Sequence, residues 1–162
     1  MKSIHRLLLL AAAAALPGAA LAHEGADHGA NPVRKEQKAW GIAGDARAAK
    51  RSIEVAMSDA MRFTPDAIGV RRGETVRLVF RNDGAQLHEF VLSTKKELEE
   101  HAARMLRFPH IEHDEPYTTH VPAGQTRETV WRFNRAGDFD FACLIPGHYQ
   151  AGMVGKVSVS AK

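Results

Sequence analysis

Short stretches in which hydrophobic and polar residues alternate recur along the chain from residue 52 onward. Between residues 75 and 81, Val76, Leu78 and Phe80 fall on one face of an extended segment. A period of two is typical of strands that bury one face. The pattern and the turns between segments predict strands over residues 52–57, 61–64, 67–70, 75–81, 87–93, 126–133, 138–143 and 153–160. Six to eight short strands in about 110 residues predict an all-β Greek-key sandwich or barrel.

One segment has a helical period instead. Thr94 is followed three residues later by Glu97, which forms a capping box if the carboxylate reaches back to the cap amide. Apolar residues then recur at helical spacing, at Leu98, Ala102, Met105 and Leu106. Pro109 ends the segment, and a polar, histidine-rich loop follows over residues 110–116. We therefore expect one short helix inserted between strands.

The first 22 residues predict an export signal. A basic start with Lys2 and Arg6 precedes an apolar run over residues 7–16, and Ala20 and Ala22 form a small-x-small cleavage site. The run is too short to span a membrane, and no cysteine follows the cleavage point to carry a lipid anchor. We expect cleavage after Ala22 and a periplasmic protein without a membrane anchor.

The sequence divides into three parts on this interpretation. Residues 1–22 are the signal peptide, residues 23–50 a flexible arm rich in Ala, Gly, charge and His, and residues 51–162 the folded domain. The net charge falls from +3 to +1 when Lys2 and Arg6 are removed. No cluster of basic residues with interleaved aromatics remains, so the composition does not indicate a nucleic-acid partner.

Cys143 is the only cysteine, which is unusual in an exported protein. Four interpretations are open: a disulfide between two molecules, a reactive thiol, a metal-bound thiolate, or an inert core residue. Its neighbours favour the metal, because Cys143, His148 and Met153 follow one another in a C-x4-H-x4-M pattern with a Pro-Gly turn inside. His88, which follows a strong turn at the start of a predicted strand, is the candidate for the fourth ligand.

Two imidazoles, a thiolate and a weak thioether are the donor set of a type 1 copper site. Zinc prefers four strong donors in a tetrahedron, and methionine is a poor zinc ligand. The sequence therefore predicts one type 1 copper ion held by His88, Cys143, His148 and Met153.

The chain also resembles the cupredoxin family of small blue-copper proteins. The resemblance rests on residues 61–65, 73–76, 88–90 and 143–153 and covers most of the mature domain. It implies a two-sheet Greek-key barrel with copper at one end, three strong ligands and Met153 as the axial one. The arm, the helix and residues 112–116 are most similar to periplasmic cupredoxins associated with bacterial copper tolerance.

The remaining histidines are candidates for auxiliary, weaker copper sites. The α-amine and imidazole of His23, with His28 close by, form a chelate for Cu(II), unless the arm is simply disordered. His110, His113 and His120 lie in or near a loop with three carboxylates, which is either a Cu(II) or zinc site or a solvated polar loop. Both pairs of alternatives stay open.

The methionines outside the pattern have a simpler interpretation. Met57 and Met61 either offer thioethers to Cu(I) or fill the core, and core packing is favoured because methionine is a common gap-filler. Met105 is assigned to the core and His101 to the surface.

The predicted function is copper binding with electron transfer in the service of copper tolerance, by binding copper or by oxidising Cu(I). The alternative is a diffusible electron carrier between respiratory redox proteins, with a cytochrome or an oxidase as partner. An enzyme is not expected: a multicopper oxidase needs histidines flanking the cysteine, which residues 141–145 lack, and a copper nitrite reductase needs a second domain. We expect a monomer.

Overall fold

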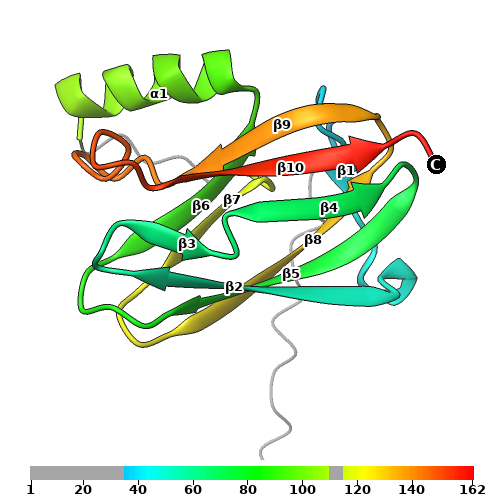
Figure 1. Cartoon of the computed structure of the whole chain (residues 1–162), viewed down its shortest axis with the longest axis horizontal. Coiled ribbons are helices and arrows are strands. Elements are labelled where there is room, and N and C mark those ends of the chain that lie inside the picture. Colours follow the sequence, from blue (N-terminus) through cyan, green and yellow to red (C-terminus); the bar gives the residue numbers. More distant parts are fainter. Residues whose placement is uncertain (1–34, 110–114) are drawn as a thin grey trace, which may run out of the picture. The chain divides into compact units, whose positions relative to one another are not determined.

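Two five-stranded sheets pack face to face (Figure 1). The structure is a computed structural model that describes residues 35–109 and 115–162. In order across the first sheet, the strands are β1 (Ile42–Ala43), β8 (Thr126–Phe133), β5 (Glu74–Asn82), β2 (Arg51–Ser58) and β3 (Arg62–Thr64). The second sheet contains β4 (Ala67–Arg71), β10 (Val154–Ser160), β9 (Gly137–Ala142), β6 (His88–Ser93) and β7 (Thr118–Val121).

The chain passes repeatedly from one sheet to the other. It crosses between β3 and β4, β4 and β5, β5 and β6, β7 and β8, and β8 and β9. Two pairs of strands, β2 with β5 and β4 with β10, run parallel, while the other paired strands are antiparallel. The prediction of an all-β sandwich with one helix is confirmed, and the eight strands expected from alternation are all present.

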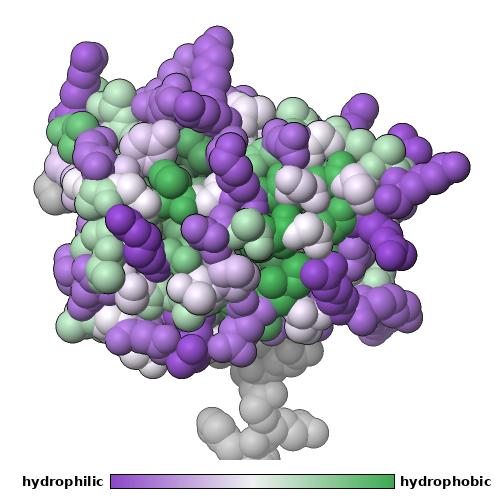
Figure 2. Space-filling model, viewed as in Figure 1, coloured by the Kyte–Doolittle hydropathy of each residue, from purple (hydrophilic) through white to green (hydrophobic). Residues whose placement is uncertain are grey.

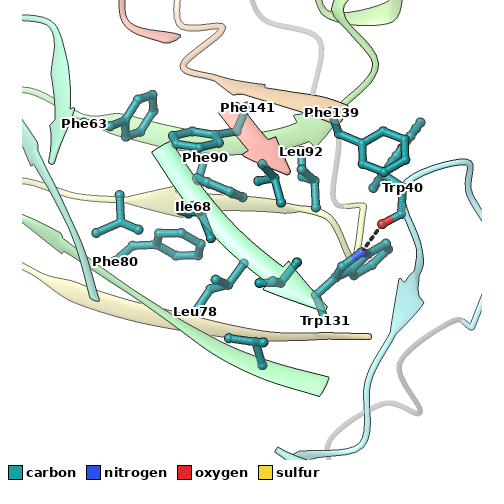
Figure 3. Packing of buried hydrophobic residues seen from close by; sticks show 14 of the residues in the cluster. Trp40, Phe63, Ile68, Leu78, Phe80, Phe90, Leu92, Trp131, Phe139 and Phe141 are labelled. Carbon is teal, nitrogen blue, oxygen red and sulfur yellow. Dashed lines mark hydrogen bonds between the residues drawn. The ribbon is translucent and has the colours of Figure 1, made fainter. Parts of the chain in front are cut away.

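Aromatic side chains from both sheets fill the space between them (Figure 3). Phe90 of β6 stacks on Phe80 of β5, with ring centroids 4.4 Å apart, and on Phe141 of β9 at 4.9 Å. Phe63 of β3 contacts Phe141 edge to face at 5.0 Å. All four rings belong to the main core between the sheets, because alternate side chains of a strand point to the same face.

The helix α1 (Lys95–Arg107) lies on the outer face of the second sheet (Figure 1). A second hydrophobic cluster forms beneath it, made of Val91, Leu98, Ala102, Met105, Ala142 and Leu144. Three of the four predicted apolar helix positions are therefore buried, whereas Leu106 is 53% exposed. Leu106 is adjacent to Met105, and the sheet contacts only a narrow stripe of the helix.

Thr94 caps the helix as the sequence predicts. Its side chain accepts a hydrogen bond from the Glu97 N–H at 3.3 Å. The Glu97 carboxylate differs from the expected capping box, because it accepts from the hydroxyls of Ser93 and Thr94. The Thr94 side chain thus caps the Glu97 N–H, and two hydroxyl groups take the place of the cap amide as donors to the Glu97 carboxylate.

The described part of the predicted flexible arm is folded against the sandwich. Trp40 is 4% exposed, and its carbonyl accepts a hydrogen bond from Trp131 Nε1–H at 2.9 Å (Figure 3). Gly41 has a φ of 128°, and a Cβ there would lie 2.4 Å from the Arg132 carbonyl oxygen. Part of the segment predicted as a flexible arm, residues 35–50, thus packs against the sandwich at Trp40; residues 23–34 lie outside the described residues.

On the face drawn in Figure 2, hydrophobic residues reach the surface over β4 and β2. A hollow is lined by Arg51, Val70, Arg71 and Glu74 among others, so charged side chains lie at its border. Within the described residues, no helix is both long and apolar enough to cross a membrane.

Candidate metal centre

Three buried donor groups meet at one end of the sandwich. His88, Cys143 and His148 each offer one ligand atom, and these atoms all lie within 4.8 Å of one another. His148 Nδ1 lies 3.3 Å from Cys143 Sγ and 3.3 Å from His88 Nδ1. The His88 and Cys143 side chains are 0% exposed and His148 is 7% exposed, so only one member of the group reaches the surface.

Neighbouring strands bring the first two groups together. His88 is the first residue of β6, and Cys143 directly follows β9. Because β6 and β9 pair with Val91 opposite Ala142, the start of one strand lies beside the end of the other. His148 then comes from the ligand loop, residues 143–153, which joins β9 to β10 at the left of Figure 1.

The ligand loop is held in shape by its own backbone. The His148 N–H donates to the Ile145 carbonyl at 2.9 Å, and the Met153 N–H donates to the His148 carbonyl at 3.1 Å. The Cys143 N–H donates to the Met153 carbonyl at 3.1 Å, which ties the two ends of the loop together. Gly147 has a φ of 92°, a conformation that favours glycine, and so permits the turn that aims His148 inward.

Met153, the predicted fourth ligand, lies in the main core cluster with an exposure of 0%. Its backbone pairs with Cys143, which places it beside the strand end that carries the thiol. A buried thioether in this place suits a soft, weak ligand. The role of Met153 as the axial ligand stays a prediction.

Burial determines the protonation state of the group without a metal. It raises the pKa of the Cys143 thiol to about 12, against weaker opposing effects of two hydrogen bonds, including the Glu89 N–H that lies 3.4 Å from Sγ. Burial, with the nearby His88 ring as a smaller cause, lowers the pKa of His148. The thiol is therefore protonated at neutral pH until a metal displaces the proton. Two imidazoles, a thiolate and a thioether fit copper in both oxidation states, because soft donors favour Cu(I) and imidazole suits Cu(II).

Sequence analysis missed an acidic residue that contacts a candidate ligand. Asp59, in the turn between β2 and β3, has Oδ1 3.1 Å from His88 Nε2. The Ala85 N–H donates to its other oxygen at 2.8 Å, and this bond is the largest cause of a lowered Asp59 pKa. Gly84 leaves room for the carboxylate in this position, because a Cβ would lie 2.0 Å from Asp59 Oδ1. Nothing in the local sequence shows this contact, since Asp59 and His88 are 29 residues apart.

A second acidic residue, Glu89, lies next to His88 and is 0% exposed. Its Oε1 accepts a hydrogen bond from the Leu144 N–H at 2.8 Å, one residue after Cys143. Its Oε2 lies 2.9 Å from His120 Nε2, a contact that is ionic when His120 is protonated. A signal for Glu89 was present in the sequence: it is a carboxylate inside an otherwise hydrophobic strand.

The other sequence candidates have varied positions. His120, a candidate auxiliary ligand, is 43% exposed on β7 and pairs with Glu89. His23, His28, His110 and His113 lie outside the described residues. Met57 and Met105 are buried in the two hydrophobic clusters, and Met61 is partly buried against the main one. Core packing therefore accounts for Met57 and Met105.

The chain belongs to the plastocyanin/azurin family of copper-binding proteins, whose family model matches residues 49–160. This confirms the resemblance drawn from the sequence. Solved structures with the same fold include auracyanin B, with a TM-score of 0.62, 22% identity, and coverage of 74% of this chain and 96% of that one. An azurin from Methylomonas sp. strain J gives a TM-score of 0.56 with 16% identity, over 69% of this chain and 99% of its own.

Curated relatives match over nearly their whole length. The copper-resistant cuproprotein CopI of Rubrivivax gelatinosus is 48% identical over 160 residues, which cover 96% of this chain and 97% of that protein. The copper-resistant cuproprotein CopI of Pseudomonas aeruginosa is 37% identical, over 83% of this chain and 89% of its own. A protein of the same name from Vibrio cholerae is 31% identical, over 85% and 86% of the two chains.

Proposed function

We propose that this protein binds one copper ion through His88, Cys143, His148 and Met153 and serves copper tolerance after export to the periplasm. The observation that carries the proposal is the buried group of two imidazoles and a thiol within 4.8 Å, in a chain of a copper-binding family. The names of three relatives matched over most of their length support the tolerance role. No comparable observation favours the alternative of a respiratory electron carrier.

The chain's own residues prepare the site for the ion. Bound copper supplies a one-electron couple between Cu(I) and Cu(II). Cys143 gives up its proton to become a thiolate, and the tied loop holds His148 and Met153 close to it. Burial of all four residues excludes water from the donor atoms, while the 7% exposure of His148 leaves an imidazole edge close to solvent.

Absorption spectroscopy of the copper-loaded protein tests the site. Wild type is expected to show an intense visible band from thiolate-to-copper charge transfer with one copper per chain, and Cys143→Ser is expected to lose the band. Met153→Leu should keep copper but shift the band, because the axial donor is removed. Met105→Leu is the matched control, a buried methionine beneath α1, and should leave the spectrum unchanged. A band that persists in Cys143→Ser would refute the site.

Growth tests the biological role. A strain that lacks the gene should become sensitive to copper, and the wild-type gene, but not the Cys143→Ser gene, should restore growth. The same strains grown on alternative electron acceptors provide the comparison. A respiratory defect without copper sensitivity would refute the tolerance role and favour the electron carrier.

A further inference from the structure

We propose that Asp59 and Glu89 are positioning residues whose negative charges bias the copper centre toward Cu(II). Asp59 contacts the ligand His88, and Glu89 contacts the ligand Cys143. The inference rests on the proposed function, because it assumes that copper binds at His88, Cys143 and His148. It adds a property that the ligand set alone does not define: which oxidation state the protein stabilises.

Asp59 acts on the histidine from the first half of the site. A carboxylate oxygen only accepts hydrogen bonds, so the 3.1 Å contact with His88 Nε2 requires the proton to be on Nε2. The other ring nitrogen, Nδ1, then keeps its lone pair, and it is the atom that lies 3.3 Å from His148 Nδ1. Asp59 thus selects the tautomer that can bind a metal and makes the imidazole a stronger donor.

The Asp59 carboxylate is itself fixed in place. Ala85 N–H donates to one oxygen at 2.8 Å and Gln86 N–H to the other at 3.3 Å. These donors belong to the loop between β5 and β6 that leads directly into His88. One carboxylate therefore joins the β2–β3 turn to the loop that precedes His88. Both segments together fix the orientation of the His88 ring.

Glu89 acts on the thiol from the second half of the site. Its backbone N–H lies 3.4 Å from Cys143 Sγ, and its side chain accepts the Leu144 N–H at 2.8 Å. One residue therefore contacts both the thiol and the backbone immediately after it. Because Glu89 also directly follows His88, it links the histidine strand to the ligand loop.

The burial of Glu89 makes its charge effective. The side chain is 0% exposed, and a charge interacts more strongly where water does not screen it. His120 Nε2 lies 2.9 Å from the carboxylate, but that side chain is 43% exposed, so solvent screens a charge on His120 more than the buried one. A nearby negative charge stabilises Cu(II) more than Cu(I), since Cu(II) carries the larger positive charge.

The test measures Cu(I) and Cu(II) affinities and the reduction potential of Asp59→Asn and Glu89→Gln, variants that keep an oxygen acceptor but lose the charge. Removal of a group that orients a ligand changes metal affinity by about 10- to 100-fold. We expect each variant to lower the Cu(II) affinity about tenfold relative to the Cu(I) affinity, which corresponds to a potential about 59 mV higher for one electron. Asp138→Asn, the same charge change at the far end of β9, should leave the ratio unchanged.

The outcomes separate this inference from the proposed function. Unchanged or lower potentials, or equal losses of Cu(I) and Cu(II) affinity, would overturn the charge bias while leaving copper binding intact. Nitrogen NMR of the copper-free protein adds a measurement without metal: His88 should carry its proton on Nε2, and a proton on Nδ1 would overturn the role of Asp59. Should Glu89→Gln fail to fold, Asp59→Asn decides the bias alone, because Asp59 lies at a surface turn with 36% side-chain exposure.

Discussion

Strands β6 and β10 lie on either side of β9 in the same sheet, yet they differ in how much of each strand is exposed to solvent. All six residues of β6 are buried, whereas β10 alternates between buried and exposed positions. The difference comes from α1, which packs over the outer face beside Val91 and Ala142 but leaves the outer face of β10 in solvent. Val91 of β6 lies in the cluster beneath α1, and His88 and Glu89 at the start of the same strand are both 0% exposed.

Removing the cover should have the largest effect on stability. Leu98 is 2% exposed on the sheet-facing side of α1, so Leu98→Ala is expected to lower the free energy of unfolding by about 2–5 kcal/mol. Leu106 is the matched control, since it is 53% exposed and its replacement by Ala should change stability by less than about 0.5 kcal/mol. Urea unfolding of the copper-free proteins measures both, and equal losses would contradict the orientation of the helix.

A smaller effect should distinguish the two outer strand faces directly. Val91 on β6 is 1% exposed, and Val91→Ala should lower the free energy of unfolding by about 2 kcal/mol through lost burial and a small cavity. Lys156 occupies an exposed position on β10 opposite Asp140, and Lys156→Ala should have an effect below about 0.5 kcal/mol. Thermal unfolding of both variants measures the contrast, which would vanish if α1 were detached in solution.

The smallest expected effect is the change in copper affinity for each pH unit, which depends on the buried Cys143 thiol. Because burial raises the pKa of Cys143 to about 12, copper must displace a proton at every pH below that value. Copper affinity should therefore rise about tenfold, or about 1.4 kcal/mol, for each pH unit between pH 8 and 10, a range in which the lowered pKa of His148 keeps that imidazole neutral. Competition with a chelator of known pH dependence measures the slope, with one proton released per copper. A slope of zero would mean that the thiol is already ionised without metal.

The strands and the three-residue cluster were predictable because their signals are local. Alternation at Val76, Leu78 and Phe80 follows from one buried face, and the short spacing from Cys143 to His148 fits within one loop. The short strand β7 was missed, since its four residues lie at the sheet edge next to a polar segment and only Val121 is buried. Its pairing with β6 depends on residues about thirty positions earlier, which no local period reveals.

The contacts around the ligands were not predictable for the same reason. Asp59 reaches His88 only because the β2–β3 turn lies against the loop before β6, and Gly84 leaves space for the carboxylate. Glu89 accepts the Leu144 N–H, which belongs to a loop 55 residues further along the chain. Trp40 anchors a polar segment through Trp131, a residue 91 positions later. In each case the decisive partner is distant in sequence.

The hydrogen bond that joins the two ends of the ligand loop has an evolutionary consequence. Since the Cys143 N–H closes on the Met153 carbonyl, the nine residues between them form a separate unit outside the paired strands. Changes in the length of this loop are expected to leave the register between β9 and β10 unchanged. Natural selection can therefore modify the metal preference of such a protein through one short segment while the rest of the chain is inherited unaltered.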